Sequence, residues 1–213
     1  MQIKKNPPTY MDQFKCPTGK DGITVAKLMN NRHSELTDWG LKKAEIKPNF
    51  VILDIGCGGG ETLKKLAQKT LQGTVFGIDH SKDMVNFSRE VNKENVKKDR
   101  VFVVEGSVEK MKFSDDFFDL VTGIETYYFW PNLSDAFREI KRVLKPKGKL
   151  LLINEMIKDG SFEIKNAKII KETQVKLVRL KKIQKMLKEQ GFIEIKVFRK
   201  TNSAWNVVIA QKP

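Results

Sequence analysis

The residues whose types and spacing most clearly indicate chemistry are a run of glycines and a later aspartate. Glycines at 56 and 58–60 directly follow the largely apolar run 51–55. Because glycine has no Cβ, the main chain there can come close to a ligand. Asp79 closes a second apolar run, at the distance where a nucleotide-binding α/β unit presents a carboxylate to ribose hydroxyls. The pattern predicts a site for a nucleoside-containing ligand; the alternative is a glycine turn that only packs a helix on a strand.

The glycine pattern differs from the two common phosphate-binding loops. A dinucleotide fingerprint reads Gly-x-Gly-x-x-Gly, but counted from Gly56 the third glycine position holds Glu61. The Gly-x-x-x-x-Gly-Lys-Ser/Thr loop is also absent from the sequence. Asp54 before the loop and Glu61 after it would repel a pyrophosphate, so the loop suits a ligand that carries positive charge nearby.

A second group of candidate residues follows the fourth predicted strand. Glu125 precedes four successive aromatic residues at 127–130. Four rings cannot all enter a core from one loop, so some are expected to line a cavity, with local packing as the alternative for each ring. A carboxylate in an aromatic pocket can orient a substrate amine or accept its proton. His33 is a second candidate base, because its pKa lies near neutrality; the alternative is an exposed histidine at a helix end.

Predicted strands alternate with predicted helices along most of the chain. Strands are expected at 50–55, 74–79, 101–105, 117–123, 150–154, 192–198 and 204–210. Helices are expected at 21–43 in two segments, at 61–69, after a cap at Ser81, at 134–144 and at 173–190, where Gly191 ends the helix. The last two strands are too close in sequence for a parallel crossover and must be antiparallel. The fold class is therefore α/β, a doubly wound seven-stranded sheet that is parallel except at its last strand.

The chain of 213 residues suits one structural domain. Residues 1–47 are expected to form an N-terminal arm, rich in proline, followed by helices. Residues 48–213 are expected to form the ligand-binding sheet domain.

Several motifs in this order resemble those of the class I S-adenosylmethionine-dependent methyltransferases. Residues 53–60, Leu-Asp-Ile-Gly-Cys-Gly-Gly-Gly, are similar to the first motif of that family, and Asp79 is similar to its second. Residues 144–150 resemble the turn into its fifth strand, and the antiparallel strand pair is the family hallmark. The resemblance covers about residues 50–213 and is nearest to the ubiquinone/menaquinone methyltransferase-like group. It implies a Rossmann-like fold with residues 21–43 as a helical lid.

The resemblance also implies which residues serve the reaction. S-adenosylmethionine would be bound, and S-adenosylhomocysteine released, by Asp54, Gly56, Cys57, Gly58, Asp79, His80, Met84, Gly106, Ser107, Val108, Gly123 and Ile124. Met84 is equally compatible with a plain core position. Many family members have an acidic residue where Ser107 stands, which leaves Ser107 or the main chain at Val108 to read the adenine. Glu125 and His33 would act on the methyl acceptor, with Tyr127 and Tyr128 shaping its pocket.

The sequence favours a small-molecule acceptor without identifying it. Residues 123–126 read Gly-Ile-Glu-Thr, where enzymes that methylate base amines carry Asn/Asp-Pro-Pro-Tyr/Phe. The Pro-Cys nucleophile of cytosine-C5 enzymes is absent as well. Two alternatives stay open: an RNA or ribosome methyltransferase, and a cofactor-binding regulatory protein without catalysis.

The net charge of +14 would suit a nucleic-acid partner, but the chain has 33 Lys and only 7 Arg, and Arg is the residue that forks onto phosphates and bases. A solvated, lysine-rich surface is the simpler explanation. The two cysteines form neither a metal-type spacing nor a disulfide framework, and no metal site is expected. Neither a signal-peptide core nor a membrane span is recognised, so a cytoplasmic location is expected. The oligomeric state is not determined by the sequence.

Overall fold

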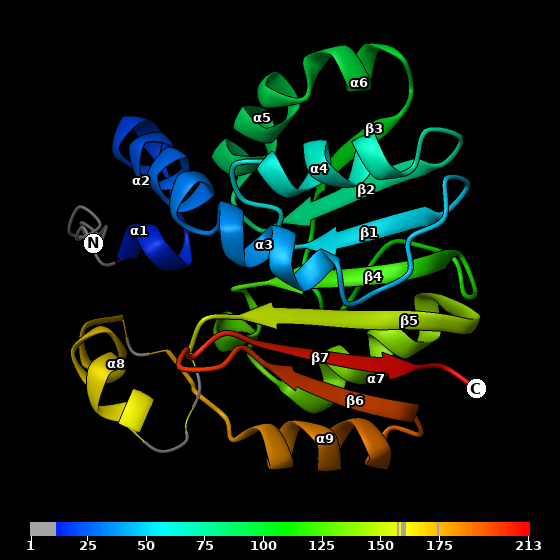
Figure 1. The fold of residues 1–213 in the computed structure, drawn as a ribbon. Helices are drawn as coiled ribbons and strands as arrows, with labels where there is room; N and C mark the ends of the chain where they lie inside the picture. The colour runs from blue at the N-terminus through cyan, green and yellow to red at the C-terminus, as the bar shows by residue number, and fades with distance from the viewer. Residues whose placement is uncertain (1–11, 157, 159–160, 174) are drawn as a thin grey trace, which may run out of the picture.

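A computed structural model describes residues 12–156, 158, 161–173 and 175–213. Seven strands form one sheet in the order β3-β2-β1-β4-β5-β7-β6 (Figure 1). The strands are β1 (Val51–Ile55), β2 (Thr74–Asp79), β3 (Val101–Glu105), β4 (Phe118–Ile124), β5 (Leu144–Asn154), β6 (Ile193–Arg199) and β7 (Asn206–Gln211). β7 runs antiparallel to both β5 and β6, and the other pairs are parallel. The predicted fold class is confirmed.

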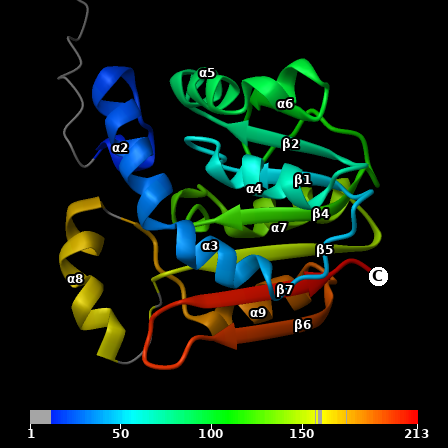
Figure 2. The same ribbon diagram turned by 45° about the horizontal axis from the view of Figure 1, so that its top comes forward.

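Helices cover both faces of the sheet (Figures 1 and 2). Side chains of α3 (Ser34–Leu41), α4 (Glu61–Lys69) and α5 (Lys82–Val91) pack on one face, where Leu36, Leu63 and Val85 are buried. Those of α7 (Leu133–Val143) and α9 (Leu180–Glu189) pack on the other, where Phe137 and Ile183 are buried. The central strands are buried on both sides, as expected for parallel strands between two helical layers.

Local signals fix several element ends, and those at Ser81 and Gly191 were predicted. The Ser81 hydroxyl accepts a hydrogen bond from the Met84 amide and caps α5. The Asn132 side chain caps α7 in the same way, by accepting from the amides of residues 134 and 135. Gly191 follows α9 with a φ of +77°, the left-handed conformation that glycine adopts most easily.

The predicted helix at 173–190 is wrong as a single element. α8 (Ser161–Thr173) ends at the residue where the predicted helix was expected to begin. Residues 175–179 are not helical, and α9 starts only at Leu180. A single helix would have placed Lys176 and Arg179 on one basic face with Lys182 and Lys185; only the last two lie in α9, so this shared face does not form. Strand β5 also begins earlier than predicted, at Leu144 rather than 150, because the pairing with β4 continues across an irregularity between Phe118 and Leu120. Two short helices, α1 (Asp12–Lys15) and α6 (Lys93–Lys97), were not predicted.

The N-terminal helices lie across the carboxyl ends of the parallel strands. In Figure 1 the arrowheads of β1, β2 and β5 point toward α1, α2 (Gly19–Arg32) and α8. Polar contacts hold these helices in place: the Ser81 hydroxyl donates to the Pro17 carbonyl at 2.5 Å, and Lys65 Nζ of α4 contacts Asp38 Oδ1 of α3 at 2.8 Å. The N-terminal segment up to residue 11 lies outside the described residues.

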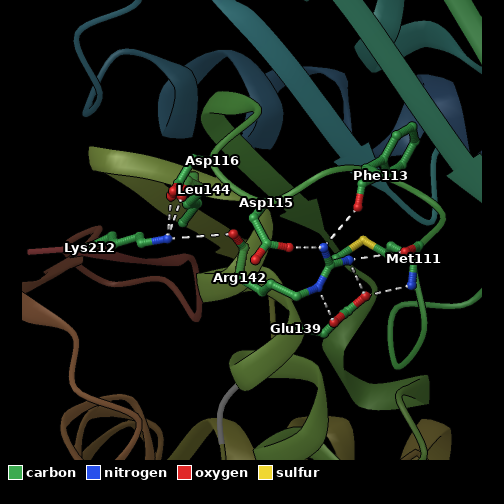
Figure 3. Close-up of polar contacts among 8 residues, drawn as sticks. All are labelled: Met111, Phe113, Asp115, Asp116, Glu139, Arg142, Leu144 and Lys212. Carbon is green, nitrogen blue, oxygen red and sulfur yellow. Dashed lines mark hydrogen bonds and ion pairs between the residues drawn. The ribbon is translucent and has the colours of Figure 1, made fainter.

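A cluster around Arg142 stabilises the opposite end of the molecule (Figure 3). Its guanidinium forms hydrogen bonds with both Glu139 oxygens, with Asp115 and with the main-chain carbonyls of residues 111 and 113. The hydrogen bond from Arg142 holds the pKa of Glu139 below its usual range, although burial opposes this shift. The cluster ties α7 to the chain that leads into β4, far from the carboxyl ends of the strands.

Replacing Arg142 with alanine is expected to lower the free energy of unfolding by about 2–3 kcal/mol, because it removes several charge-assisted hydrogen bonds and leaves two carbonyls unpaired. Urea denaturation would measure the loss. Arg138→Ala, which removes an exposed ion pair with Asp135 in the same helix, is the matched control and should change stability by less than about 1 kcal/mol. Equal effects of the two substitutions would contradict the role assigned to the cluster.

Candidate active site

A cavity of about 380 Å³ lies between the N-terminal helices and the carboxyl ends of the central strands. Eleven of the twelve predicted cofactor-binding residues line it: Asp54, Gly56, Cys57, Gly58, Asp79, His80, Met84, Gly106, Ser107, Val108 and Ile124. The twelfth, Gly123, lies outside the lining, because it is packed tightly under Leu152 and Trp130. His33 and Glu125 line the same cavity, so the structure brings the two predicted groups of site residues together.

The glycine loop is shaped to bring main chain against a ligand. Gly56 and Gly58 have φ values of +71° and +48°, in the left-handed region. A Cβ at Gly56 would lie 2.6 Å from the Thr126 side chain, whereas one at Gly58 would meet no atom nearer than 4.0 Å. Gly58 thus borders open cavity space that a side chain would fill. The alternative of a glycine turn that serves packing alone accounts for Gly56 but not for Gly58.

The Asp79 carboxylate lies at the loop with oxygens that can accept further hydrogen bonds. One oxygen accepts from the Gly58 amide and the other from the Ser81 amide, each at 2.9 Å. These contacts fix the orientation of the side chain, which is 6% exposed. A carboxylate has about four acceptor positions, so the orientation leaves capacity for two hydroxyl donors in the cavity.

Asp54 is buried at the end of β1 and carries a perturbed charge. The Thr122 hydroxyl donates to its Oδ1 at 2.6 Å. Burial raises the pKa of Asp54 to about 7, which the bond from Thr122 opposes and the neighbouring Asp79 carboxylate supports. Near neutral pH the carboxyl group of Asp54 is therefore fully ionised only when a neighbouring cation lowers its pKa.

Asp54 should make stability fall as pH rises. Its pKa is raised on folding, so the folded protein binds more protons than the unfolded chain between about pH 4 and 7, and the stabilisation present at low pH is lost through this window. Asp54→Asn keeps the acceptor for Thr122 without the charge. From pH 5 to pH 8 the variant should gain about 2 kcal/mol in free energy of unfolding relative to the parent chain. Urea denaturation at both pH values measures this, and an unchanged difference would refute the assignment.

The remaining predicted cofactor residues surround the cavity near the carboxyl ends of β2 and β3. His80 is half-exposed, with Nδ1 3.8 Å from Asp79 Oδ1. Met84 is completely buried and also lines the cavity, so its two predicted roles coincide. A Cβ at Gly106 would meet no atom nearer than 4.0 Å, which marks a second place where main chain borders open space. Burial raises the pKa of the Cys57 thiol well above its usual value, which makes this cysteine unreactive.

Glu125 combines strain, burial and a directed carboxylate. Its φ is +57°, a conformation that is rare for residues other than glycine. Backbone strain of this kind clusters at functional sites. Its Oε1 accepts hydrogen bonds from the Tyr128 hydroxyl and from the Glu155 amide. Burial raises the pKa of Glu125 to about 7, with His33 lowering it and Glu155 raising it. A carboxylate with this pKa can take up or release a proton near neutrality.

His33 faces Glu125 rather than solvent. Its side chain is 12% exposed, and Nε2 lies 3.9 Å from Glu125 Oε2. The alternative of an exposed helix-end histidine is therefore wrong: His33 lies at the junction of α2 and α3, which directs its ring into the cavity.

Glu155 is a site residue that the sequence analysis missed. Its Oε1 lies 3.5 Å from His33 Nε2 and 2.7 Å from Arg32 Nη2. Burial alone would raise the pKa of Glu155, but His33 and Arg32 outweigh this effect and lower it. The available signal was its position directly after β5, because the carboxyl ends of parallel strands meet at one edge.

The predicted role of Tyr127 and Tyr128 in shaping the cavity needs correction. Both rings are buried in the core, 2% exposed, and lie outside the cavity lining. The next two aromatic residues, Phe129 and Trp130, line the cavity instead. Tyr128 contributes indirectly, through the hydrogen bond from its hydroxyl to Glu125 at 3.1 Å. The short 3-10 turn at 127–129 explains the exchange, since it directs successive rings to different sides.

The charge of the cavity wall differs from that of the protein surface. The lining contains the acidic residues Asp54, Glu61, Asp79 and Glu125, and only two lysines. One of these, Lys65, is held by Ser34 and Asp38.

Among the described residues, no helix is both long and apolar enough to cross a membrane.

Comparisons with known proteins agree with these motifs. Residues 53–152 match the family model described as a methyltransferase domain. The methyltransferase YcgJ of Bacillus subtilis (strain 168), itself described as uncharacterized, is 35% identical over 127 residues, which are 57% of this chain and 47% of the relative. Demethylmenaquinone methyltransferase of Lactobacillus johnsonii is 25% identical, with 71% of each chain covered. This chain spans less than half the length of the first curated relatives that it matches.

Solved structures share the fold. Phosphoethanolamine N-methyltransferase 2 of Haemonchus contortus, in complex with S-adenosyl-L-methionine, has a TM-score of 0.73 at 22% identity over 84% of this chain and 52% of that chain. A methyltransferase from Aquifex aeolicus has a TM-score of 0.70 at 21% identity over 90% of this chain and 98% of that chain. With the glycine loop, Asp79 and the 3-2-1-4-5-7-6 sheet in place, residues 53–152 match the methyltransferase-domain family, and the chain shares the fold of the class I S-adenosylmethionine-dependent methyltransferases.

Proposed function

We propose that this protein transfers a methyl group from S-adenosylmethionine to a small-molecule acceptor. The observation that carries the proposal is a single cavity whose lining combines two chemically different groups of residues. The first group is the glycine loop with Asp79, and the second is Glu125, His33 and two aromatic rings. A cofactor and an acceptor can therefore meet in one cavity.

The residues of the first group fit the cofactor. Open space beside Gly58 and Gly106 leaves room for a ligand against the main chain, and the Asp79 carboxylate has free acceptor positions for the two ribose hydroxyls. The buried Asp54 offers charge to the amino-acid tail, while His80 and Met84 flank the adenine, with Ser107 and Val108 at its edge. When bound, the cofactor supplies an electrophilic methyl group on a sulfonium.

The residues of the second group act on the acceptor. Glu125 and His33 orient the nucleophile and take up its proton, and Tyr128 fixes the Glu125 carboxylate for this task. Phe129 and Trp130 give the acceptor an apolar wall, whose faces also attract positive charge. Most of the rate would come from holding the reacting atoms in line in a dry site.

The N-terminal helices complete the cavity, and we assign residues 1–47 as arm and lid and 48–213 as the cofactor-binding domain. Val25, Asn30 and His33 of the lid all line the cavity. The Asn30 side chain donates to the Gly59 carbonyl at 3.3 Å, and this contact of α2 with the glycine loop supports the assignment. Exclusion of water by this segment would strengthen every electrostatic contact inside.

Relatives support a small-molecule acceptor. They include a sterol 4-C-methyltransferase of Caenorhabditis elegans and the demethylmenaquinone methyltransferase of Lactobacillus johnsonii. The acidic wall of the cavity disfavours the phosphates of RNA, the main alternative suggested by the net charge of +14. The scarcity of cysteine agrees with a cytoplasmic enzyme.

The test is a methyl-transfer assay with radiolabelled cofactor against panels of small amines, phenols, quinols and sterols, and against total RNA. Transfer to a small molecule supports the proposal. Transfer only to RNA, with binding that weakens steeply between two salt concentrations, would favour the RNA alternative. Cofactor binding without transfer to any acceptor would favour a regulatory protein.

A further inference from the structure

His33 and Glu125, which line the cavity, form a cluster of potential metal ligands with Glu155, which lies beside them but not in the lining. One ligating atom from each lies within 4.8 Å of the other two. The three residues come from the α2–α3 junction, the end of β4 and the end of β5, so the fold and not the sequence spacing brings them together. We propose that these side chains bind a divalent transition-metal ion whose remaining coordination position faces the cavity; while the ion is bound, His33 and Glu125 serve as ligands and not as proton acceptors.

The separations fit a shared ion better than direct hydrogen bonds. His33 Nε2 lies 3.5 Å from Glu155 Oε1 and 3.9 Å from Glu125 Oε2. A charge-assisted hydrogen bond between such groups would measure about 2.7–2.9 Å. Two ligands that are each about 2.0–2.1 Å from a tetrahedral Zn²⁺ lie about 3.4 Å apart. The imidazole is thus spaced from each of the two carboxylates as a neighbouring ligand around a common centre.

The groups behind the cluster orient it toward that centre. Glu125 is 7% exposed, and its Oε1 is occupied by the Tyr128 hydroxyl and the Glu155 amide. Its Oε2 accepts no hydrogen bond from the described residues and is directed at His33. Arg32 fixes Glu155 through its Nη2 at 2.7 Å. Ligating carboxylates in metal sites are commonly held by outer partners of this kind.

The donor set indicates the class of ion and of ligand. One imidazole and two carboxylates suit Zn²⁺, Mn²⁺ or Co²⁺ better than Mg²⁺, which prefers oxygen alone. Three protein ligands leave a position open, as in catalytic rather than structural sites. Two carboxylates and Arg32 sum to one negative charge, so a divalent ion would leave one positive charge, which an anionic oxygen of the acceptor would neutralise. Metal binding itself does not depend on the proposed function; only the position of the acceptor oxygen at the ion rests on it.

The test uses the full chain without an affinity tag, freed of metal with a chelator and titrated with Zn²⁺ alone by calorimetry. We expect one equivalent to bind and to raise the thermal unfolding midpoint. His33→Ala should weaken binding by at least the roughly 10- to 100-fold that loss of an outer partner costs. The chain has only two histidines, so His80→Ala is the matched control and should bind Zn²⁺ like the parent. Glu155→Gln provides an independent second variant in case His33→Ala unfolds.

Absence of stoichiometric binding, or binding that survives both His33→Ala and Glu155→Gln, overturns the inference; the latter result would place the ion elsewhere, for example at a cysteine. Co²⁺ absorption in the parent chain should show the bands of a four- or five-coordinate ion. These measurements need neither cofactor nor acceptor. A chain that binds the ion but transfers no methyl group refutes the proposed function alone, and a chain that transfers methyl but binds no ion refutes this inference alone.

Discussion

Replacing Asp79 with alanine is expected to weaken S-adenosylmethionine binding by about 30- to 100-fold. The proposed role of this carboxylate is to accept hydrogen bonds from both ribose hydroxyls, and hydrogen bonds to charged groups contribute about 1.5–3 kcal/mol each. Part of the loss would be offset by water, so about 2–3 kcal/mol remains, and each 1.4 kcal/mol changes affinity tenfold. Calorimetry with S-adenosylmethionine and S-adenosylhomocysteine would measure the change.

The control must separate ribose contacts from damage to the loop, because Asp79 also accepts hydrogen bonds from the Gly58 and Ser81 amides. A deoxyribose analogue of S-adenosylhomocysteine provides this separation. The parent chain should bind this analogue more weakly than the ribose form. The Asp79→Ala variant should bind the two forms with the same affinity. Glu105 is the residue of β3 that pairs with Asp79 in the strand register. Glu105→Ala removes its carboxylate and should leave the affinity for S-adenosylmethionine within about twofold. If the variant still distinguishes the two forms as the parent does, Asp79 does not bind the ribose.

The sequence predicted those parts of the fold that depend on local patterns. Strand β2 and helix α4 have the predicted bounds, and the cap at Ser81 and the glycine after α9 end their helices as expected. The sheet class followed from the alternation of strands and helices, and the antiparallel pairing of the last two strands followed from their short connection, which leaves no room for a crossover. The segment 173–190 failed because amphipathic spacing continues across residues 175–179, while the main chain there follows tertiary contacts, such as that of the Lys176 amide with the Tyr128 carbonyl.

The site shows the same division. The cavity-lining glycines and the strand-end residues that belong to a recognisable motif were predictable, because their position in the motif fixes their place in the fold. The roles of the aromatic residues 127–130 depended on the direction of each side chain in a tight turn, which the sequence does not specify. Glu155 was missed since its function depends on His33 and Arg32, which lie more than a hundred residues away in the chain. A ligand cluster assembled from three separate elements has no spacing that a motif could detect.

Replacing Glu125 with glutamine is expected to reduce kcat by about 100-fold while cofactor affinity changes by less than about threefold. General acid–base groups typically contribute about 10²–10⁴-fold, and the lower end applies here because an in-line methyl transfer does not require a strong base. Glutamine keeps the volume and an acceptor oxygen for the Tyr128 hydroxyl but cannot take up a proton. Steady-state kinetics and cofactor calorimetry on the same preparation would measure both quantities.

Tyr128→Phe is the informative companion, because it removes only the hydroxyl that positions Glu125. This variant should lower kcat less than Glu125→Gln does, and in the double variant the effects should fall well short of adding, since both act through one carboxylate. Fully additive losses would show that Tyr128 acts on the core and not on the site. Parent-like kcat and KM in Glu125→Gln would reduce Glu125 to a scaffold residue. The left-handed backbone at Glu125 would then serve packing and not catalysis, and the surrounding core would have to stabilise this strained conformation.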